Sequence, residues 1–166
     1  MLEPYLGEML LHPLTEMTRE LMGRLGIRAG NLSSTMWHAI TYVPVSDERA
    51  EERGFNQAER LAAWVSRSCG IPLVNLLVRQ KHSAKQSFKT RSERMRDMQN
   101  IFEIEREGLE GLVQCFSKSA SQNAPMRLLL VDDIYTTGST IQACSEVIHR
   151  GVSCPLEIYA LTWARS

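Results

Sequence analysis

The sequence has no excess of charge of either sign and no long hydrophobic run. Its 19 Lys and Arg residues balance 19 Asp and Glu residues, so the overall charge favours neither a polyanionic nor a polycationic partner. The apolar stretches fall short of the about 20 residues that a membrane-spanning helix needs. The first residues include early acids and no basic leader, which argues against a secretory signal. We therefore expect a cytoplasmic protein without a membrane span.

Clustered cysteines and the common nucleotide-binding motifs are also absent. The four cysteines are scattered, with no CxxC pair and no zinc-like spacing to the four histidines. We therefore expect reduced thiols and no metal centre built from Cys and His. The chain contains no P-loop pattern and no GxGxxG that opens a helix, which argues against these two ways of binding a nucleotide.

The sequence does contain an alternation of apolar strands and amphipathic helices. The predicted strands cover residues 36–45, 71–78, 101–104, 126–131 and 154–164, and the predicted helices cover residues 13–25, 56–70, 90–100 and 141–151. The stretch 105–125 contains two glycines and a polar run, and is predicted to be an elaborated surface connection. Strands separated by helices indicate an α/β fold with a largely parallel sheet, formed by residues 1–166 as one domain.

The helix predicted over residues 56–70 has a signal at each end. Asn56 and Glu59 have the spacing of a capping box, with Asn in place of the usual Ser or Thr. Leu61 and Val65 share one face, and Gly70 is typical of a helix end. The pattern predicts a helix that packs one apolar face against the sheet.

The stretch RLLLVDDIYTTGST, residues 127–140, carries the strongest functional signal. Asp132 and Asp133 follow a continuous apolar run, at the carboxyl end of a strand, where ligands bind in parallel sheets. Two ionised carboxylates are pure acceptors that match the neighbouring hydroxyl donors of a ribose. A tight turn follows them and leads into a helix start, where backbone N–H groups and hydroxyls can surround a phosphate. The turn residues are Thr136, Thr137, Gly138, Ser139 and Thr140.

This pattern predicts a site for a ribose 5-phosphate. The alternative is that the two aspartates only cap a helix and that the threonines form an ordinary turn. For a lone Asp pair or a lone TTG this alternative would be preferred, but the whole string after an apolar strand favours the ligand site.

The string LLLVDDIYTTGST resembles the motif that binds 5-phosphoribosyl-1-pyrophosphate (PRPP) in type I phosphoribosyltransferases. The resemblance implies the type I phosphoribosyltransferase fold, a largely parallel central sheet flanked by helices with a small hood, here placed in residues 1–35. It also implies that Asp132 and Asp133 meet the ribose hydroxyls and act in catalysis, while residues 136–140 hold the 5-phosphate. Mg²⁺ would enter with PRPP and be reached through Asp132 and Asp133.

Two further segments resemble the ComF family of competence-associated, phosphoribosyltransferase-like proteins. These are VPVSDERAEERGFNQAERLA (43–62) and RQKHSAKQS (79–87), followed by an Arg-rich segment that ends at Phe102. Many members carry an N-terminal four-cysteine zinc module, and this sequence contains none; Asp97 stands where an Asn is common. The resemblance implies a role in natural transformation, the uptake of DNA. It also implies Mg²⁺-dependent phosphoribosyl transfer with pyrophosphate release, to an acceptor that no motif identifies.

The resemblance also implies a site for the pyrophosphate. The residues expected to bind it are Arg53, Gly54, Asn56 and Arg79, with Lys81 and Lys85 in catalytic roles and His82 nearby. Residues 79–97 contain seven Lys or Arg against two acids, the strongest local imbalance in the chain. In an enzyme, this segment would close over PRPP and exclude water.

The basic segment leaves two other functions open. It could bind single-stranded nucleic acid, DNA above all, through Lys81, Lys85, Lys89 and Arg91, or bind a protein of the competence machinery, with the PRPP pocket kept as a sensor or relic. It could also be only a solvated face. An ordinary nucleobase-salvage transferase is a third hypothesis, and the short remainder after Gly151 counts against it. Relatives of this fold often pair, so a homodimer is also open.

Overall fold

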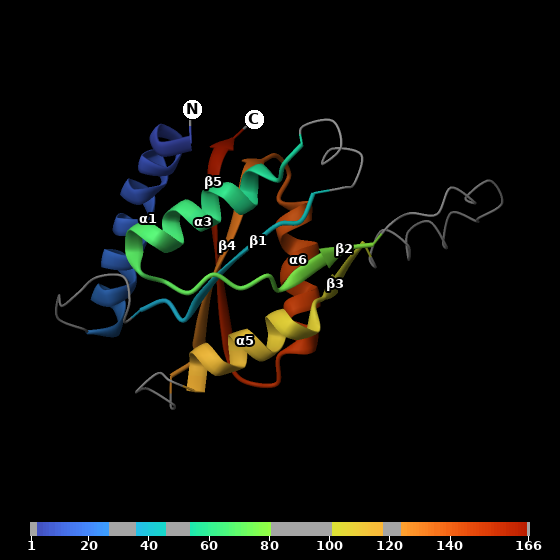
Figure 1. Cartoon of the computed structure of the whole chain (residues 1–166). Coiled ribbons are helices and arrows are strands. Elements are labelled where there is room, and N and C mark those ends of the chain that lie inside the picture. The colour runs from blue at the N-terminus through green and yellow to red at the C-terminus, as the bar shows by residue number, and fades with distance from the viewer. Residues whose placement is uncertain (1–2, 27–35, 46–53, 81–100, 118–123, 166) are drawn as a thin grey trace.

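The computed structural model describes residues 3–26, 36–45, 54–80, 101–117 and 124–165. The elements are α1 (Glu3–Leu25), β1 (Ala39–Tyr42), α3 (Gln57–Cys69), β2 (Leu77–Arg79), β3 (Phe102–Ile104), α5 (Arg106–Ser117), β4 (Met126–Tyr135), α6 (Ser139–Gly151) and β5 (Leu156–Arg165) (Figure 1). Among these described elements, no helix combines the length and the apolar character needed to span a bilayer.

Three parallel strands form the main sheet, in the order β1-β4-β5. The last paired residues of β1 and β4 are Tyr42 and Val131, whereas β4 and β5 stay paired as far as Tyr135 and Arg165. The apolar run at the start of β4 is completely buried because helices cover both faces of the sheet. The predicted α/β class with a parallel sheet is therefore confirmed.

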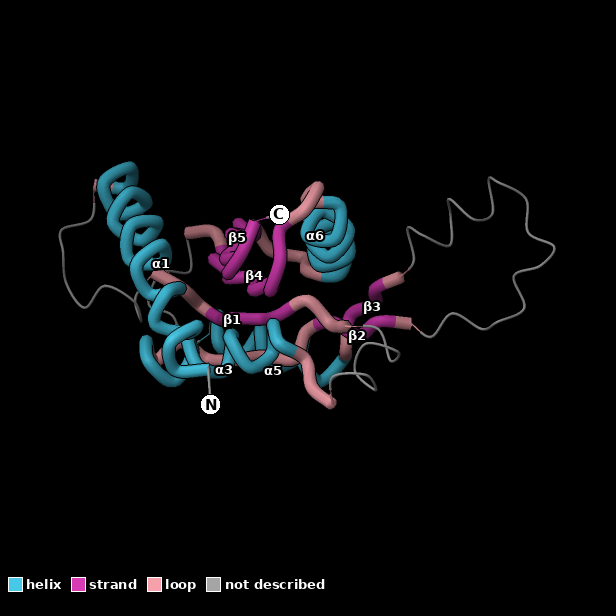
Figure 2. Tube along the Cα trace, turned by 90° about the horizontal axis from the view of Figure 1, so that it is seen from above, coloured by secondary structure: helices cyan, strands magenta, loops and turns pink. Residues whose placement is uncertain are grey.

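Alternate side chains of β4 pack into two separate hydrophobic clusters. Leu129 and Val131 pack into a cluster with α1 and α3 on one face. Leu128 and Leu130 pack on the other face with α6 and with Leu112 of α5. Figure 2 shows the same arrangement from above, with β4 and β5 between α1 and α6. This two-sided burial holds the carboxyl ends of the strands in place.

The prediction of one strand over residues 71–78 is wrong. Leu73 forms an isolated parallel bridge with Ile40, and the chain then leaves the main sheet. The backbone N–H of Leu76 donates to the Thr41 hydroxyl at 3.4 Å instead of to a strand. β2 begins at Leu77 and pairs antiparallel with β3, which forms a two-stranded ribbon of its own. The bridge consists of two hydrogen bonds, from the Ile40 N–H to the Pro72 carbonyl at 2.7 Å and from the Val74 N–H to the Ile40 carbonyl at 2.8 Å.

α1 begins at Glu3, ten residues earlier than the predicted start at 13, and contains Pro13 in its interior. Interior proline costs a helix about 3 kcal/mol. Leu10, Leu14 and Leu21 form a buried stripe on both sides of the proline and pack in the cluster with α3. Packing of this stripe against the rest of the protein stabilises a helix that continues through Pro13. From the sequence, Pro13 had indicated a helix start.

Residues 106–117 form α5, where the sequence predicted an irregular surface connection. Gly108 and Gly111 made a helix less favoured by the sequence pattern. Gly108, however, is needed because α5 lies against the backbone of residue 75 at this point. A Cβ built at Gly108 would lie 1.9 Å from the carbonyl oxygen of Asn75, so the helix packs directly on the backbone of that segment. Leu112 is fully buried. α5 is thus part of the core that covers one face of the sheet.

Candidate functional site

The sequence predicted that the strand before the two aspartates ends at Val131. β4 instead continues through both aspartates to Tyr135. Because β1 pairs with β4 only as far as Tyr42 and Val131, the side of β4 beyond this point has no strand beside it among the described residues. A cavity of about 280 Å³ lies there, which we call the strand-end cavity. Its lining comes from the end of β1, the start of α3, the end of β2 and the last part of β4: Val43, Pro44, Val45, Ala58, Arg79, Asp132, Asp133, Ile134, Thr136 and Thr140.

Asp132 and Asp133 both line this cavity. The backbone N–H of Asp133 donates to Oδ1 of Asp132 at 2.9 Å, and the Asp132 side chain is almost entirely buried. Burial, followed by the negative charge of Asp133, raises the pKa of Asp132 from 3.8 to about 6. The pair is therefore strained when both carboxylates are ionised. A ligand with hydroxyl donors or positive charge would relieve that strain.

Arg79 brings a positive charge to the same cavity from the end of β2. Its guanidinium lies 5.7 Å from the centre of the Phe102 ring, which supports it from β3. Burial and the charge of Asp132 raise the pKa of Cys144, a buried thiol of α6, to about 12, and the charge of Arg79 opposes this. The tertiary structure thus brings together an arginine and an acidic pair that the sequence places in separate motifs.

The turn after β4 leaves the start of α6 open. Gly138 is the N-cap residue, with φ of 79°, and it makes no side-chain cap of α6. The Thr137 hydroxyl accepts from the Ser139 N–H at 3.4 Å and lies 3.0 Å from the Ser139 hydroxyl. The first N–H groups of a helix have no acceptor inside the helix, and those after Ser139 are suited to bind an anion.

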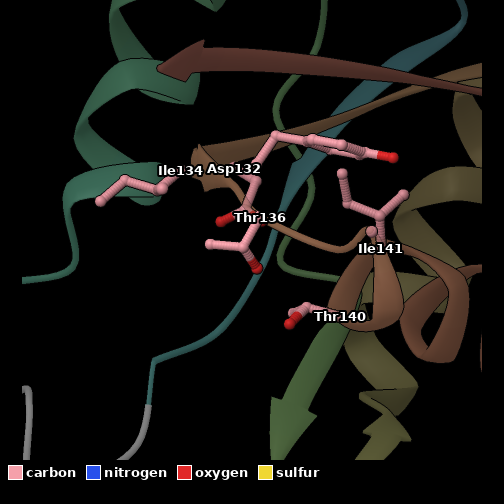
Figure 3. Close-up of a pocket in the computed structure, with 7 residues that line it drawn as sticks. Asp132, Ile134, Thr136, Thr140 and Ile141 are labelled. Atoms are coloured by element: carbon pink, nitrogen blue, oxygen red, sulfur yellow. The ribbon is translucent and has the colours of Figure 1, made fainter. Parts of the chain in front are cut away.

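A niche of about 10 Å³, room for at most one water molecule, lies between this turn and Asp132. Figure 3 shows Thr136 and, from the first turn of α6, Thr140 on two sides of it. The Gly138 position favours glycine because of its positive φ, and a Cβ there would also lie 2.8 Å from the Tyr135 hydroxyl, at the end of a side chain. The turn and the acidic pair therefore form one continuous polar surface.

Asn56 was predicted to contact pyrophosphate, and its side chain makes three hydrogen bonds within the protein. Its Oδ1 accepts from the N–H groups of Ala58, at 3.0 Å, and Glu59, at 3.4 Å, and its Nδ2 donates to the Val43 carbonyl at 3.1 Å. Ala58 and Val43 both line the strand-end cavity. Asn56 thus caps α3 and ties it to the end of β1, which positions the wall of the cavity.

The predicted capping box is half formed. Asn56 caps α3 and Gly70 ends it with φ of 67°, as the sequence indicated. Glu59 instead hydrogen bonds the Tyr42 hydroxyl at the end of β1. Burial, with the charge and hydrogen bond of Glu59, raises the pKa of Tyr42 to about 12. A second contact therefore joins the start of α3 to β1.

Replacing Asn56 with alanine is expected to lower the free energy of unfolding by about 1–2 kcal/mol, because two N–H groups of α3 lose their acceptor. Urea denaturation measures this change. Asn56→Ser is the matched variant, since its hydroxyl keeps a cap acceptor for α3 and removes the donor to Val43. It should retain most of the stability. An unfolding midpoint of Asn56→Ala equal to that of the wild type would contradict the assigned role.

Several predicted residues lie outside the described residues. They are Arg53, Lys81, His82, Lys85, Lys89 and Arg91, together with the helix predicted over residues 90–100. The nucleic-acid alternative therefore stays a prediction. Gly54 is described, exposed and has φ of 73°. Sequence reasoning missed Ile134, which lines the strand-end cavity and is 41% exposed; its place between the aspartates and threonines was the available signal.

Sequence comparison places the chain beside three competence proteins, and no family model matches it. It is 32% identical to competence protein ComFC of Bacillus subtilis (strain 168) over 120 residues, 72% of this chain and 42% of that protein. It is 32% identical to competence protein F of Haemophilus influenzae over 113 residues, 68% of this chain and 44% of that protein. The chain is 29% identical to competence protein ComFC of Streptococcus pneumoniae over 124 residues, which are 75% of this chain and 47% of that protein. The chain thus spans less than half the length of these relatives.

Among solved structures, a hypoxanthine phosphoribosyltransferase from Staphylococcus aureus gives a TM-score of 0.40 with 10% identity, over 99% of this chain and 74% of that chain. The α/β assignment rests on the described sheet and helices, and not on this likeness.

Proposed function

We propose that this chain, which belongs to the ComF family, binds PRPP with Mg²⁺ in the strand-end cavity and serves natural transformation. The observation that carries the proposal is the convergence of Asp132, Asp133 and Arg79 on one cavity, beside the start of α6. The names of its relatives, which are competence proteins, support the cellular role. The reaction we propose is phosphoribosyl transfer with release of pyrophosphate.

The acidic pair would hold the ribose through its two neighbouring hydroxyls. The bond from the Asp133 N–H orients the Asp132 carboxylate, and both residues line the cavity, so two acidic acceptors face it. Hydroxyl donors stabilise the ionised pair, which counters the burial and repulsion that raise the pKa of Asp132. Binding of a diol is therefore favoured where binding of an apolar group is not.

The residues present fit Mg²⁺ only as an ion shared with the ligand. Magnesium in nucleotide sites commonly takes one or two carboxylates and completes its shell with phosphate oxygens and water. Within the described parts of the chain, no group of three or more His, Cys, Asp or Glu could hold a metal. Asp132 and Asp133 would be the protein's contribution, and bound Mg²⁺ would neutralise charge on the pyrophosphate.

The other cavity residues have separate tasks in the proposed transfer. Cleavage of the bond between C1 of the ribose and the pyrophosphate oxygen leaves positive charge on the sugar and negative charge on the leaving group. Arg79 would stabilise the leaving group, and the start of α6 would hold the 5-phosphate so that the sugar stays fixed. Thr136 and Thr140 would donate hydroxyl hydrogen bonds to that phosphate.

Calorimetric titration with two ligands tests this division. PRPP with Mg²⁺ should bind the wild type, and ribose 5-phosphate should bind more weakly. Asp133→Asn should weaken both ligands by about tenfold or more, because both carry the diol. Arg79→Gln should weaken PRPP by a similar factor and leave ribose 5-phosphate little changed, because only PRPP carries the diphosphate.

Arg106→Gln is the matched control for Arg79→Gln. Arg106 is an exposed arginine of α5 that is absent from the cavity lining, so its loss should leave PRPP affinity unchanged. If PRPP does not bind the folded wild type with Mg²⁺, or if Asp133→Asn binds it equally well, the proposal fails. Equal loss of both ligands in Arg79→Gln would place the arginine at the sugar rather than at the diphosphate.

A further inference from the structure

β5 is the last strand of the main sheet and has one open edge. It pairs with β4 along Leu156 to Arg165, and no other described strand pairs with it. In Figure 2, α1 and α6 lie over the two faces of the sheet, and β5 stands at its end. Every second backbone N–H and carbonyl of an edge strand points away from its neighbour and can bind a further strand.

The middle of this edge carries none of the usual protection. Natural edge strands are kept apart by charged side chains, proline or short length. β5 has ten residues, and from 158 to 164 it contains no charged residue, proline or glycine. Ile158, Tyr159 and Trp163 are only partly buried. The indole N–H of Trp163 is buried and has no acceptor in the described chain. The surroundings of this strand are thus incomplete in one copy.

The two charges of β5 lie at its ends and have opposite signs. Glu157 and Arg165 are equally distant from Leu161 along the strand. If a second β5 pairs antiparallel about Leu161, Glu157 of each copy faces Arg165 of the other. In the same register Tyr159 faces Trp163, and Leu161 faces itself. Opposite charges and aromatic pairs are the cross-strand pairs that stabilise antiparallel sheets.

We propose that the open edge of β5 binds β5 of a second copy of this chain, which joins the two sheets into one across a two-fold axis. The pairs Glu157–Arg165 and Tyr159–Trp163 then each occur twice, and Leu161 lies on the two-fold axis, as in an isologous interface. A parallel pairing in register would instead set Glu157 beside Glu157 and Arg165 beside Arg165. It would also lack closure by a two-fold axis and would tend toward open chains of molecules.

The contacts inside one copy are compatible with this register. Glu157 accepts from Arg127 Nε at 3.0 Å and from the Tyr159 hydroxyl at 3.2 Å, yet its side chain is 42% exposed. Arg165 lies at the surface, with its guanidinium 5.8 Å from the centre of the Tyr135 ring. Both end charges can therefore reach across the edge while they keep these partners.

Sedimentation equilibrium over a range of protein concentrations tests the proposal. The wild type should dimerise. Ala160→Lys sets a charge on an exposed residue in the middle of the edge, opposite Thr162, and should weaken dimerisation by about tenfold or more. Arg165→Glu makes the end pairs repulsive and should weaken it in the same direction. Arg150→Glu makes the same charge change on exposed α6 and should leave dimerisation unchanged.

Circular dichroism confirms that each variant is folded, and Arg165→Glu keeps the test decisive if Ala160→Lys does not fold. A wild type that stays monomeric at every concentration overturns the proposal. A dimer that both edge variants leave intact also overturns it, because another surface then forms the interface. The result is independent of PRPP binding.

Discussion

Replacing Asp132 with asparagine is expected to abolish PRPP binding and, at neutral pH, to make the protein more stable. Binding should fall by about 100-fold or more, because the buried charged acceptor that we propose for the ribose is lost. The ionised carboxylate of Asp132 nevertheless destabilises the folded protein when no ligand is bound. Burial and the neighbouring charge of Asp133 raise the pKa of Asp132 to about 6. The residue that we propose for ligand binding therefore lowers the stability of the protein without ligand.

The pH dependence of the Asp132 pKa shift tells whether Asp132→Asn raises or lowers the free energy of unfolding. The pKa of Asp132 is raised from 3.8 in the unfolded chain to about 6 in the folded chain, so the folded chain binds the proton more tightly. The free energy of unfolding contributed by this group therefore falls as the pH rises between these two values, and stays low above them. Asparagine cannot ionise, so Asp132→Asn should be more stable by about 2–3 kcal/mol above pH 6 and should lose this advantage near pH 4.

Urea denaturation at about pH 4 and about pH 7.5 measures this difference. Glu110→Gln, an exposed carboxylate of α5, is the matched control and should change stability little at either pH. A variant Asp132→Asn that is less stable than the wild type at neutral pH would contradict the strain assigned to the acidic pair. Retained PRPP binding in the same variant would contradict the proposed function separately.

Gly108→Ala should be the most destabilising small substitution in α5. The added Cβ would lie 1.9 Å from the Asn75 carbonyl oxygen and 2.8 Å from the Leu76 Cα, and both are backbone atoms. A side chain could turn away, but backbone can yield only if α5 moves off the sheet, which would expose Leu112. We expect a loss of about 3 kcal/mol or more in the free energy of unfolding.

Gly111→Ala on the same helix is the matched comparison. Its Cβ would have Val74 Cγ1 as its nearest neighbour, at 3.5 Å, which is an ordinary contact. It should therefore stabilise the protein by about 0.5–1 kcal/mol, because alanine favours the helix over glycine. Urea denaturation of both variants checks the prediction. If the two substitutions changed stability alike, the direct packing of α5 on residues 75 and 76 would be wrong.

Much of the site could be predicted because its signals are local. The cap of α3 by Asn56 and its end at Gly70 depend on backbone groups within a few residues, and both are confirmed. The apolar run of β4 also predicts burial on both faces, whatever its neighbours are. The acidic pair and the turn after it lie in one stretch of chain. Their shared surface therefore follows from one strand and one turn.

The wrong predictions all involve contacts between distant segments. Glycines 108 and 111 argue against a helix until the backbone of Asn75 shows why Gly108 is needed. Pro13 indicates a helix start until the buried stripe of α1 is seen to continue on both sides of it. Residues 71–78 have strand composition, but which partner they pair with is decided by β1 on one side and β3 on the other.

The sequence by itself determined the chemistry of this protein: an acidic pair, a turn rich in hydroxyls and a helix start, because these follow one another along the chain. Only the tertiary structure decided that Arg79, at the end of the β2–β3 ribbon, lies in the same cavity as Asp132 and Asp133. It also decided that the cavity exists, because β4 runs past the end of β1. Local order along the chain sets which groups are available, and the pairing of strands sets which of them meet.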